Sequence, residues 1–434
     1  MKQLLQLLLT TMVLMQAAPT WAAAPSANAG RMGQYKVETG VAGYSYQVFA
    51  PKSYRPGAAA GIHLFFHGEG GANSAGNFGS WRRHFLEPYG LIGINMAYAD
   101  GKNMHDTPGK VAAARMAVAQ VMADYHVTAG RGAVGSHSGG GVPHGLWFSE
   151  AGQAGAEAWP FSHQALYGSN FWQRIRAGGR NTYLIALGTG EWGMGAPNLG
   201  ISLVERAQEL FKGVGQNTCP DVYLKITGRG HSIGDGDVRA AGASFRRWDL
   251  AYNAIVYEAH FAHPKLRPIA QQTNRLQLAA ALRALDQLAK PAEGQENPLD
   301  ADGRAQADLL RQLIDERAAA VLAMAQRLAE DDPALFDFYS PRYAEQLKGL
   351  AQEKEMAQLT ADLRKSGRVA KALAAQRAFL SIVSRLFTPK AVSILATDVP
   401  SFRKLQEDLG PKSVYGQMIE EFIKASGVEA AAGK

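Results

Sequence analysis

The sequence predicts an α/β fold, with a mostly parallel sheet covered by helices on both faces, followed by an all-α region. Between about residues 44 and 260, apolar strand-like runs alternate with helix-compatible segments. Most of these runs are apolar almost throughout, as strands buried on both faces are. Beyond about residue 265 glycine becomes scarce and leucine and alanine recur at helical spacing. We therefore expect three parts: residues 1–24, 25–265 and 266–434.

The pattern fixes the expected elements in order. The expected strands are 44–50, 61–66, 91–97, 131–136, one within 159–172, 182–187 and 221–226. Residues 44–50 alternate in polarity like an exposed antiparallel strand. The expected helices of this part are 108–124, one directly after 131–136, 201–213 and 237–261. The C-terminal stripes cover 276–288, 304–329, 342–364, 366–386 and 414–425, with a linker at 291–298.

The N-terminus has the features of a secretory signal peptide. A lysine at position 2 precedes an apolar run from Leu4 to Met15, and small residues follow up to Ala24. The run is too short to span a bilayer, and we expect no transmembrane segment elsewhere. We therefore predict cleavage near Ala22–Ala24, a periplasmic or secreted protein, and a flexible lead from Pro25 to Gly33.

The composition argues against a nucleic-acid partner, a disulfide and a cofactor. The net charge of +7 comes from interspersed lysine and arginine, with no basic block, zinc-finger spacing or aromatic RNA-binding signature. We expect no nucleic-acid partner. The single cysteine, Cys219, excludes an intrachain disulfide, and we expect a buried thiol. No motif implies a metal or an organic cofactor.

Residues 134–141, Val-Gly-Ser-His-Ser-Gly-Gly-Gly, place Ser138 between an expected strand and an expected helix. The pattern around it is small-x-Ser-x-small, formed by Ser136 and Gly140. A strained nucleophile elbow needs small residues at these positions, because a bulky side chain would clash there. A phosphate-binding loop would need a lysine or a G-x-G-x-x-G motif, and neither is present. Ser138 is therefore the candidate nucleophile, and a structural turn with an idle serine is the alternative.

An oxyanion hole is expected upstream, where the strand 61–66 ends in His67, Gly68 and Glu69. The backbone N–H of Glu69 would join that of Gly139 in holding a developing oxyanion, and Gly68 lets the backbone approach. His67 is expected to brace this turn by hydrogen bonds, and His137 and His144 to be pocket lining or surface.

The base and the acid are expected downstream. His231 lies on a glycine-bounded loop after the last expected strand, and Glu191 follows the end of strand 182–187. A histidine takes the serine proton, and a carboxylate orients the imidazole. Asp235 and Asp237 are alternative acids, although helix capping is the more natural role for both.

Residues 42–260 resemble the secreted esterases related to polyhydroxybutyrate depolymerases and feruloyl esterases, within the α/β-hydrolase superfamily. The resemblance lies in His67-Gly68 after a strand, in the segment 125–140 and in the Gly-His231-Ser ending. It implies an α/β-hydrolase fold with Ser138 as nucleophile and His231 as base. The family usually has aspartate as the acid, where this chain offers Glu191.

The sequence thus predicts a serine hydrolase that cleaves a small or polymeric carboxylic ester through an acyl-enzyme. A serine peptidase on the same scaffold stays open, as does a binding protein that acts through its helical region. The helical region could pack against the α/β part of the chain, mediate self-association or contact the cell envelope. Its aromatic side chains are expected in its core rather than on a ligand: Phe336, Phe338, Tyr339 and Tyr343.

Overall fold

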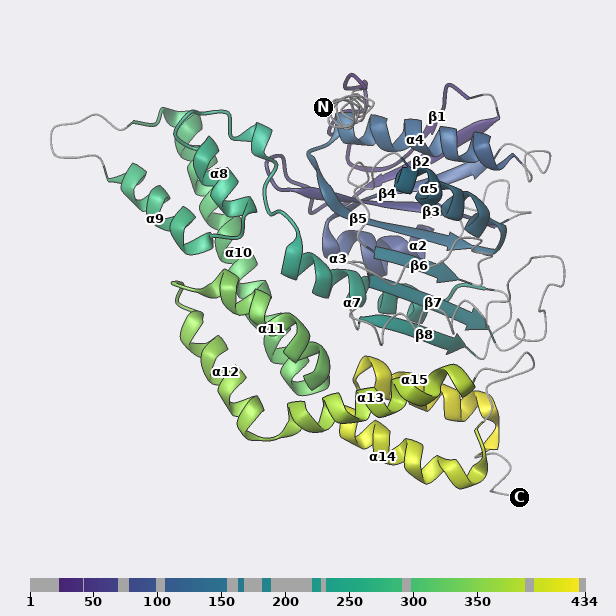
Figure 1. Cartoon of the computed structure of the whole chain (residues 1–434). Coiled ribbons are helices and arrows are strands. Elements are labelled where there is room, and N and C mark those ends of the chain that lie inside the picture. Colours follow the sequence, from purple (N-terminus) through teal and green to yellow (C-terminus); the bar gives the residue numbers. More distant parts are fainter. Residues whose placement is uncertain are drawn as a thin grey trace, which may run out of the picture.

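A computed structural model gives the fold (Figure 1). The residues that it describes are 23–41, 43–68, 78–98, 106–153, 163–167, 182–188, 221–227, 232–290, 298–386 and 394–428.

The centre is an eight-stranded sheet in the order β1-β2-β4-β3-β5-β6-β7-β8. β1 pairs antiparallel with β2, and β2 antiparallel with β4, whereas every later pairing is parallel. The mostly parallel sheet is therefore confirmed. The strands are β1 (Gly33–Glu38), β2 (Tyr44–Ala50), β3 (Ala60–Phe66), β4 (Leu91–Tyr98), β5 (Val127–His137), β6 (His163–Tyr167), β7 (Thr182–Gly188) and β8 (Val222–Thr227).

One strand differs from its prediction. β2 is mostly buried, not exposed, because the unpredicted β1 pairs along its outer edge and a helix packs against one of its faces. The segment before β1, expected to be flexible, is held in place at Ser26. The backbone N–H and the hydroxyl of Ser26 donate hydrogen bonds of 2.6 and 2.8 Å to the Asp124 carboxylate.

Helices cover both faces of the sheet, as expected (Figure 1). One face carries α4 and α5, whose buried side chains join those of β2, β3 and β4 in one cluster. The other face carries α7 and a helical segment made of α2, a π-helical turn at Arg82–Leu86, and α3. The helices are α2 (Phe78–Trp81), α3 (Glu87–Tyr89), α4 (Thr107–Asp124), α5 (Gly141–Gln153) and α7 (Asp235–Tyr252). The expected helix 201–213 lies outside the described residues.

Beyond α7 the described chain forms helices joined by turns and short extended segments. The helices are α8 (Arg267–Asn274), α9 (Leu278–Ala289), α10 (Ala301–Asp331), α11 (Pro333–Leu347), α12 (Glu353–Lys365), α13 (Arg368–Leu386), α14 (Val399–Leu409) and α15 (Val414–Ser426). The expected helix 342–364 is two helices. Gly349 breaks it with a φ of +79°, and its N–H donates to the Glu353 carboxylate at 2.8 Å. The expected helix 237–261 also ends early, at Tyr252.

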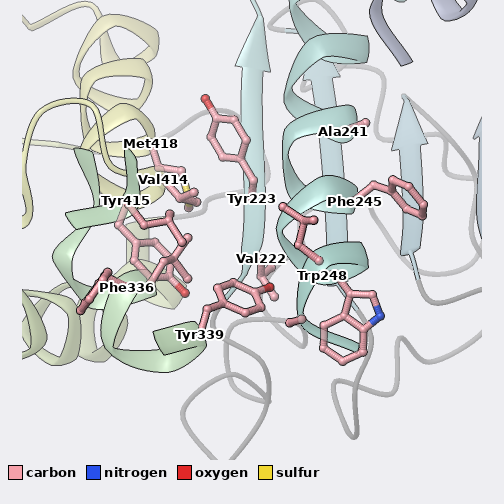
Figure 2. Close-up of a cluster of buried hydrophobic side chains, with 14 of the residues drawn as sticks. Val222, Tyr223, Ala241, Phe245, Trp248, Phe336, Tyr339, Val414, Tyr415 and Met418 are labelled. Carbon is pink, nitrogen blue, oxygen red and sulfur yellow. The ribbon is translucent and has the colours of Figure 1, made fainter. Parts of the chain in front are cut away.

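The C-terminal helices share a core with the sheet. Figure 2 shows this cluster, in which side chains of β8 and α7 meet those of α11 and α15. It includes Phe336 and Tyr339, which with Tyr343 are almost completely buried, while Phe338 is partly buried. The expectation that these aromatic residues form core is confirmed, and packing against the sheet is the role that the structure shows for the helical region.

Polar contacts reinforce the same junction. The buried Asp221, just before β8, accepts hydrogen bonds from Arg247 Nε at 2.7 Å and from the Tyr339 hydroxyl at 2.9 Å. On β8 itself, Lys225 Nζ lies 3.1 Å from the carboxylate of Glu421 on α15. In the described part of the chain, no helix has the length and apolar character needed to cross a membrane.

Candidate functional site

Ser138 lies on a strained turn between a strand and a helix. β5 ends at His137, a single 3-10 turn covers Ser138–Gly140, and α5 begins at Gly141. Ser138 has a φ of +51°, one of two positive values among non-glycine residues of the described chain. A left-handed backbone at serine costs about 1–2 kcal/mol, so the surrounding packing must hold it there. The turn projects a half-buried serine at the carboxyl end of the sheet.

Two glycines let the neighbouring backbone approach this turn. A Cβ built on Gly68 would lie 2.7 Å from Ser138 Cβ, and one on Gly140 would lie 2.2 Å from the carbonyl oxygen of Phe66. Both distances are impossible for a real side chain, so any larger residue would force the turns apart. The ends of β3 and β5, which pair in parallel, are thus pressed together at Ser138. The small residue predicted at position 140 is required by this contact.

A buried polar pair lies beneath the turn. Ser136 Oγ and His144 Nδ1 are joined by a hydrogen bond of 2.8 Å, and both residues are completely buried. The sequence suggested that His144 lines the pocket or lies on the surface. That prediction is wrong, because the side chain is completely buried. Its ring connects the first turn of α5 to the end of β5. The spacing of eight residues across a strand-to-helix turn gave no signal for this pair.

His67 has the bracing role expected of it. It is almost completely buried, and its Nδ1 donates a hydrogen bond of 2.7 Å to the Gly68 carbonyl. Burial lowers the pKa of the His67 imidazole below its ordinary value of 6.5, so the ring is neutral at pH 7. A neutral ring that holds Gly68 suits a structural role in this turn rather than proton transfer.

The structure brings together three of the six predicted site residues: Ser138, Gly139 and Gly68. Glu69, Glu191 and His231 lie outside the described residues. The strands that precede Glu191 and His231, β7 and β8, are described. Gly188 and Thr227 pair at the carboxyl ends of β7 and β8, at the edge of the sheet where β5 delivers Ser138.

The two alternative acids are occupied at the start of α7. Asp237 Oδ2 accepts a 2.8 Å hydrogen bond from the Gly234 N–H, which confirms its capping role. Asp235 accepts from the Ser80 hydroxyl at 2.6 Å, and His84 Nε2 lies 3.1 Å away. The Ser80 hydrogen bond, helped by His84, lowers the pKa of the Asp235 carboxyl. Both carboxylates thus have local partners.

Among the described residues, no group of three or more histidine, cysteine, aspartate or glutamate side chains could hold a metal ion.

No family model and no curated protein matches the chain. Solved structures do. Poly(aspartic acid) hydrolase-1 from Sphingomonas sp. KT-1 is 15% identical over 50% of this chain and 98% of its own, with a TM-score of 0.35. A thermophilic esterase from Thermogutta terrifontis is 15% identical over 51% and 95%, with a TM-score of 0.35. An acetyl xylan esterase from Aspergillus awamori is 13% identical over 48% and 99%, with a TM-score of 0.31. Similarities at these TM-scores say nothing about the reaction of this chain.

Proposed function

We propose that this protein is a serine hydrolase of the α/β-hydrolase fold, which cleaves a carboxylic ester through an acyl-enzyme on Ser138. The observation that carries the proposal is the left-handed serine at the strand-to-helix turn, with φ of +51° and with Gly68 pressed against it. Backbone strain of this kind persists only where the packing of the surrounding residues holds it in place. Such strained residues are concentrated at active sites.

The sheet topology supports the specific fold. An eight-strand order with an antiparallel second strand, a crossing of β3 and β4, and a nucleophile after β5 is the arrangement of α/β-hydrolases. Ligands of open α/β sheets bind at the carboxyl ends of the strands, which is where Ser138 lies.

In the proposed reaction, Ser138 Oγ attacks the ester carbonyl carbon while His231 takes its proton. Glu191 holds the imidazole in the correct tautomer. The N–H groups of Gly139 and Glu69 stabilise the oxyanion, each donor being worth about 3–4 kcal/mol. His231 then protonates the leaving alcohol, and a water molecule activated by the same ring releases the acid from Ser138.

The substrate is proposed as a small or polymeric carboxylic ester that the protein meets in the periplasm or outside the cell. The proposed catalytic region is 25–265, with residues 266–434 as a helical region that braces the sheet. No cofactor is needed for this chemistry.

The test is turnover of a short-chain aryl ester by the mature protein. Ser138→Ala should lose activity by several orders of magnitude, because the nucleophile is removed. Ser136→Ala is the matched control: it lies two residues away, is buried, and loses only the hydrogen bond to His144. Equal turnover in wild type and Ser138→Ala would overturn the proposal.

A substrate panel separates the alternatives on the same scaffold. Aryl esters, polyesters, feruloyl esters and peptide amides use the same triad, so relative kcat/KM assigns the bond that is cleaved. Cleavage of peptides in preference to every ester would identify a peptidase. A folded wild-type protein with no turnover of any of them would favour a binding protein.

A further inference from the structure

A cavity of about 250 Å³ lies at the amino ends of the strands, at the opposite end of the sheet from Ser138. Its walls are the segment that leads into β3, α3 and the turn after it, Arg131 of β5, the last turns of α7 and the middle of α10. Four arginines line it, and we call it the arginine cavity: Arg55, Arg131, Arg246 and Arg317.

Two of these arginines bind a single buried carboxylate, and a third donates to the backbone beside it. Asp249 is completely buried and accepts from Arg131 Nε at 2.7 Å and Nη2 at 3.1 Å, and from Arg246 Nη1 at 3.0 Å. Arg317 Nη2 donates to three backbone carbonyls at the end of α7, including that of Asp249 at 2.8 Å. One carboxylate thus faces three guanidinium groups, which leaves two positive charges uncompensated.

The remaining charges of the cavity cancel only part of this surplus. Arg55 and Glu316 neutralise each other through hydrogen bonds of 2.6 and 3.2 Å. Glu87 also lines the cavity, where its carboxylate accepts the backbone N–H of Lys52 at 3.1 Å. Even with Glu87 counted, the four arginines exceed the three carboxylates. Burial, together with the charges of Arg246 and Arg131, lowers the pKa of Arg317 to about 10 despite the attraction of Asp249.

Arg246 has hydrogen-bonding capacity to spare. Within the described residues its single hydrogen bond is the one to Asp249, although 27% of its side chain is exposed. A guanidinium group offers five N–H donors in a rigid fork. Because Arg246 lines the cavity, its other donors are available to a ligand there.

We propose that the arginine cavity binds a phosphate-type oxyanion, held by Arg246 and by the surplus positive charge of Arg131 and Arg317. Guanidinium forks match the oxygen geometry of phosphate and form charge-assisted hydrogen bonds to it. The ligand would contact α10 of the helical region as well as β5 and α7 of the sheet layer. Binding would therefore strengthen the junction between them, independently of any chemistry at Ser138.

The experiment titrates inorganic phosphate against the full mature chain. Calorimetry should show saturable binding, and the Tm should rise by about 2 °C or more at saturation relative to chloride at equal ionic strength. Phosphate also stabilises proteins non-specifically by exclusion from their surface. The informative quantity is thus the difference in Tm rise between variants.

Two variants and one control decide the outcome. Arg246→Gln should abolish saturable binding and its share of the Tm rise. Ala320→Glu, which places a carboxylate in the cavity without touching Asp249, should do the same and serves if Arg246→Gln folds poorly. Arg239→Gln removes an exposed charge from the same helix and should behave as wild type. No saturable binding by wild type, or undiminished binding in Ala320→Glu, would overturn the proposal.

Discussion

The two ends of the sheet are built by opposite means. At the carboxyl end, the backbone is strained: Ser138 is left-handed, and Gly68 and Gly140 allow contacts that no side chain could fit. At the amino end the chain is secured by charge, with Arg131 and Arg246 on the buried Asp249 and Arg317 on the end of α7.

The difference fits the proposed function, in which the amino end provides stability and the carboxyl end provides the nucleophile. The arginine contacts join β5, α7 and α10, and therefore hold the helical region to the sheet. The Ser138 turn stabilises nothing comparable and costs about 1–2 kcal/mol in backbone conformation. A feature that costs stability and presents a hydroxyl at the strand ends is best explained by function.

Apart from loss of the nucleophile itself, the largest effect should come from Glu191, the proposed triad acid. Glu191→Gln should lower kcat for an aryl ester about 10⁴-fold, because the imidazole loses its orienting carboxylate. Asp235→Asn should change it by no more than a few-fold, since Asp235 is held by Ser80 and His84. Steady-state kinetics of the two variants give the ranking, and the reverse order would move the acid to Asp235.

At the other end, Asp249→Asn should lower the free energy of unfolding by about 3–5 kcal/mol, because it leaves buried guanidinium groups without their counter-charge. The control is Asp286→Asn, which breaks an exposed pair with Arg311 and should cost at most about 1 kcal/mol. Urea unfolding measures both. Equal losses would mean that the buried cluster does not secure this end of the sheet.

The helical region should show its own pH dependence. Burial raises the pKa of Asp332 to about 6 from 3.8, against the opposing hydrogen bonds from the Leu335 and Val414 N–H groups. A raised pKa means that the fold binds the proton more tightly than the unfolded chain does. The stabilisation is complete below about pH 3.8 and is lost as the pH rises through 6, in total about 3 kcal/mol.

Asp332→Asn should therefore flatten the stability profile between pH 4 and 7, measured by urea unfolding at several pH values. The neighbouring Asp331→Asn, whose side chain is partly exposed and paired with Lys412, is the control. An unchanged slope in Asp332→Asn would show that this carboxyl does not titrate as described.

The smallest expected effect is the most specific to the Ser138 turn. Ser138→Gly should be more stable than Ser138→Ala by about 1 kcal/mol, because glycine adopts a positive φ without strain. At Ser136 in β5 the order should reverse, since glycine weakens a strand. Thermal unfolding of the four variants tests this, and the same order at both positions would argue against strain at Ser138.

The sequence predicted the strands well because buried parallel strands are apolar almost throughout, as in β3, where all seven residues are buried and His63 alone is polar. It missed β1, whose polar, half-exposed residues resemble a loop and whose pairing with β2 is a tertiary contact. It also ran residues 342–364 together, because the periodicity continues past the break at Gly349.

At the site, the motif predicted Ser138 and the small residue at position 140, since both follow from backbone geometry at one turn. It could not predict the Ser136–His144 hydrogen bond or the arginine contacts of Asp249. Arg131 lies 118 residues from Asp249, and only the fold brings the two together.

The most direct test of the central claim is the site of covalent labelling by a fluorophosphonate, mapped by mass spectrometry on the folded mature protein. A strained, activated Ser138 should carry a single phosphonyl adduct, in the tryptic peptide that begins at Gly132 after Arg131. Labelling should persist in Ser136→Ala. An adduct on another serine, or none on folded protein, would contradict the assignment of Ser138 as the nucleophile.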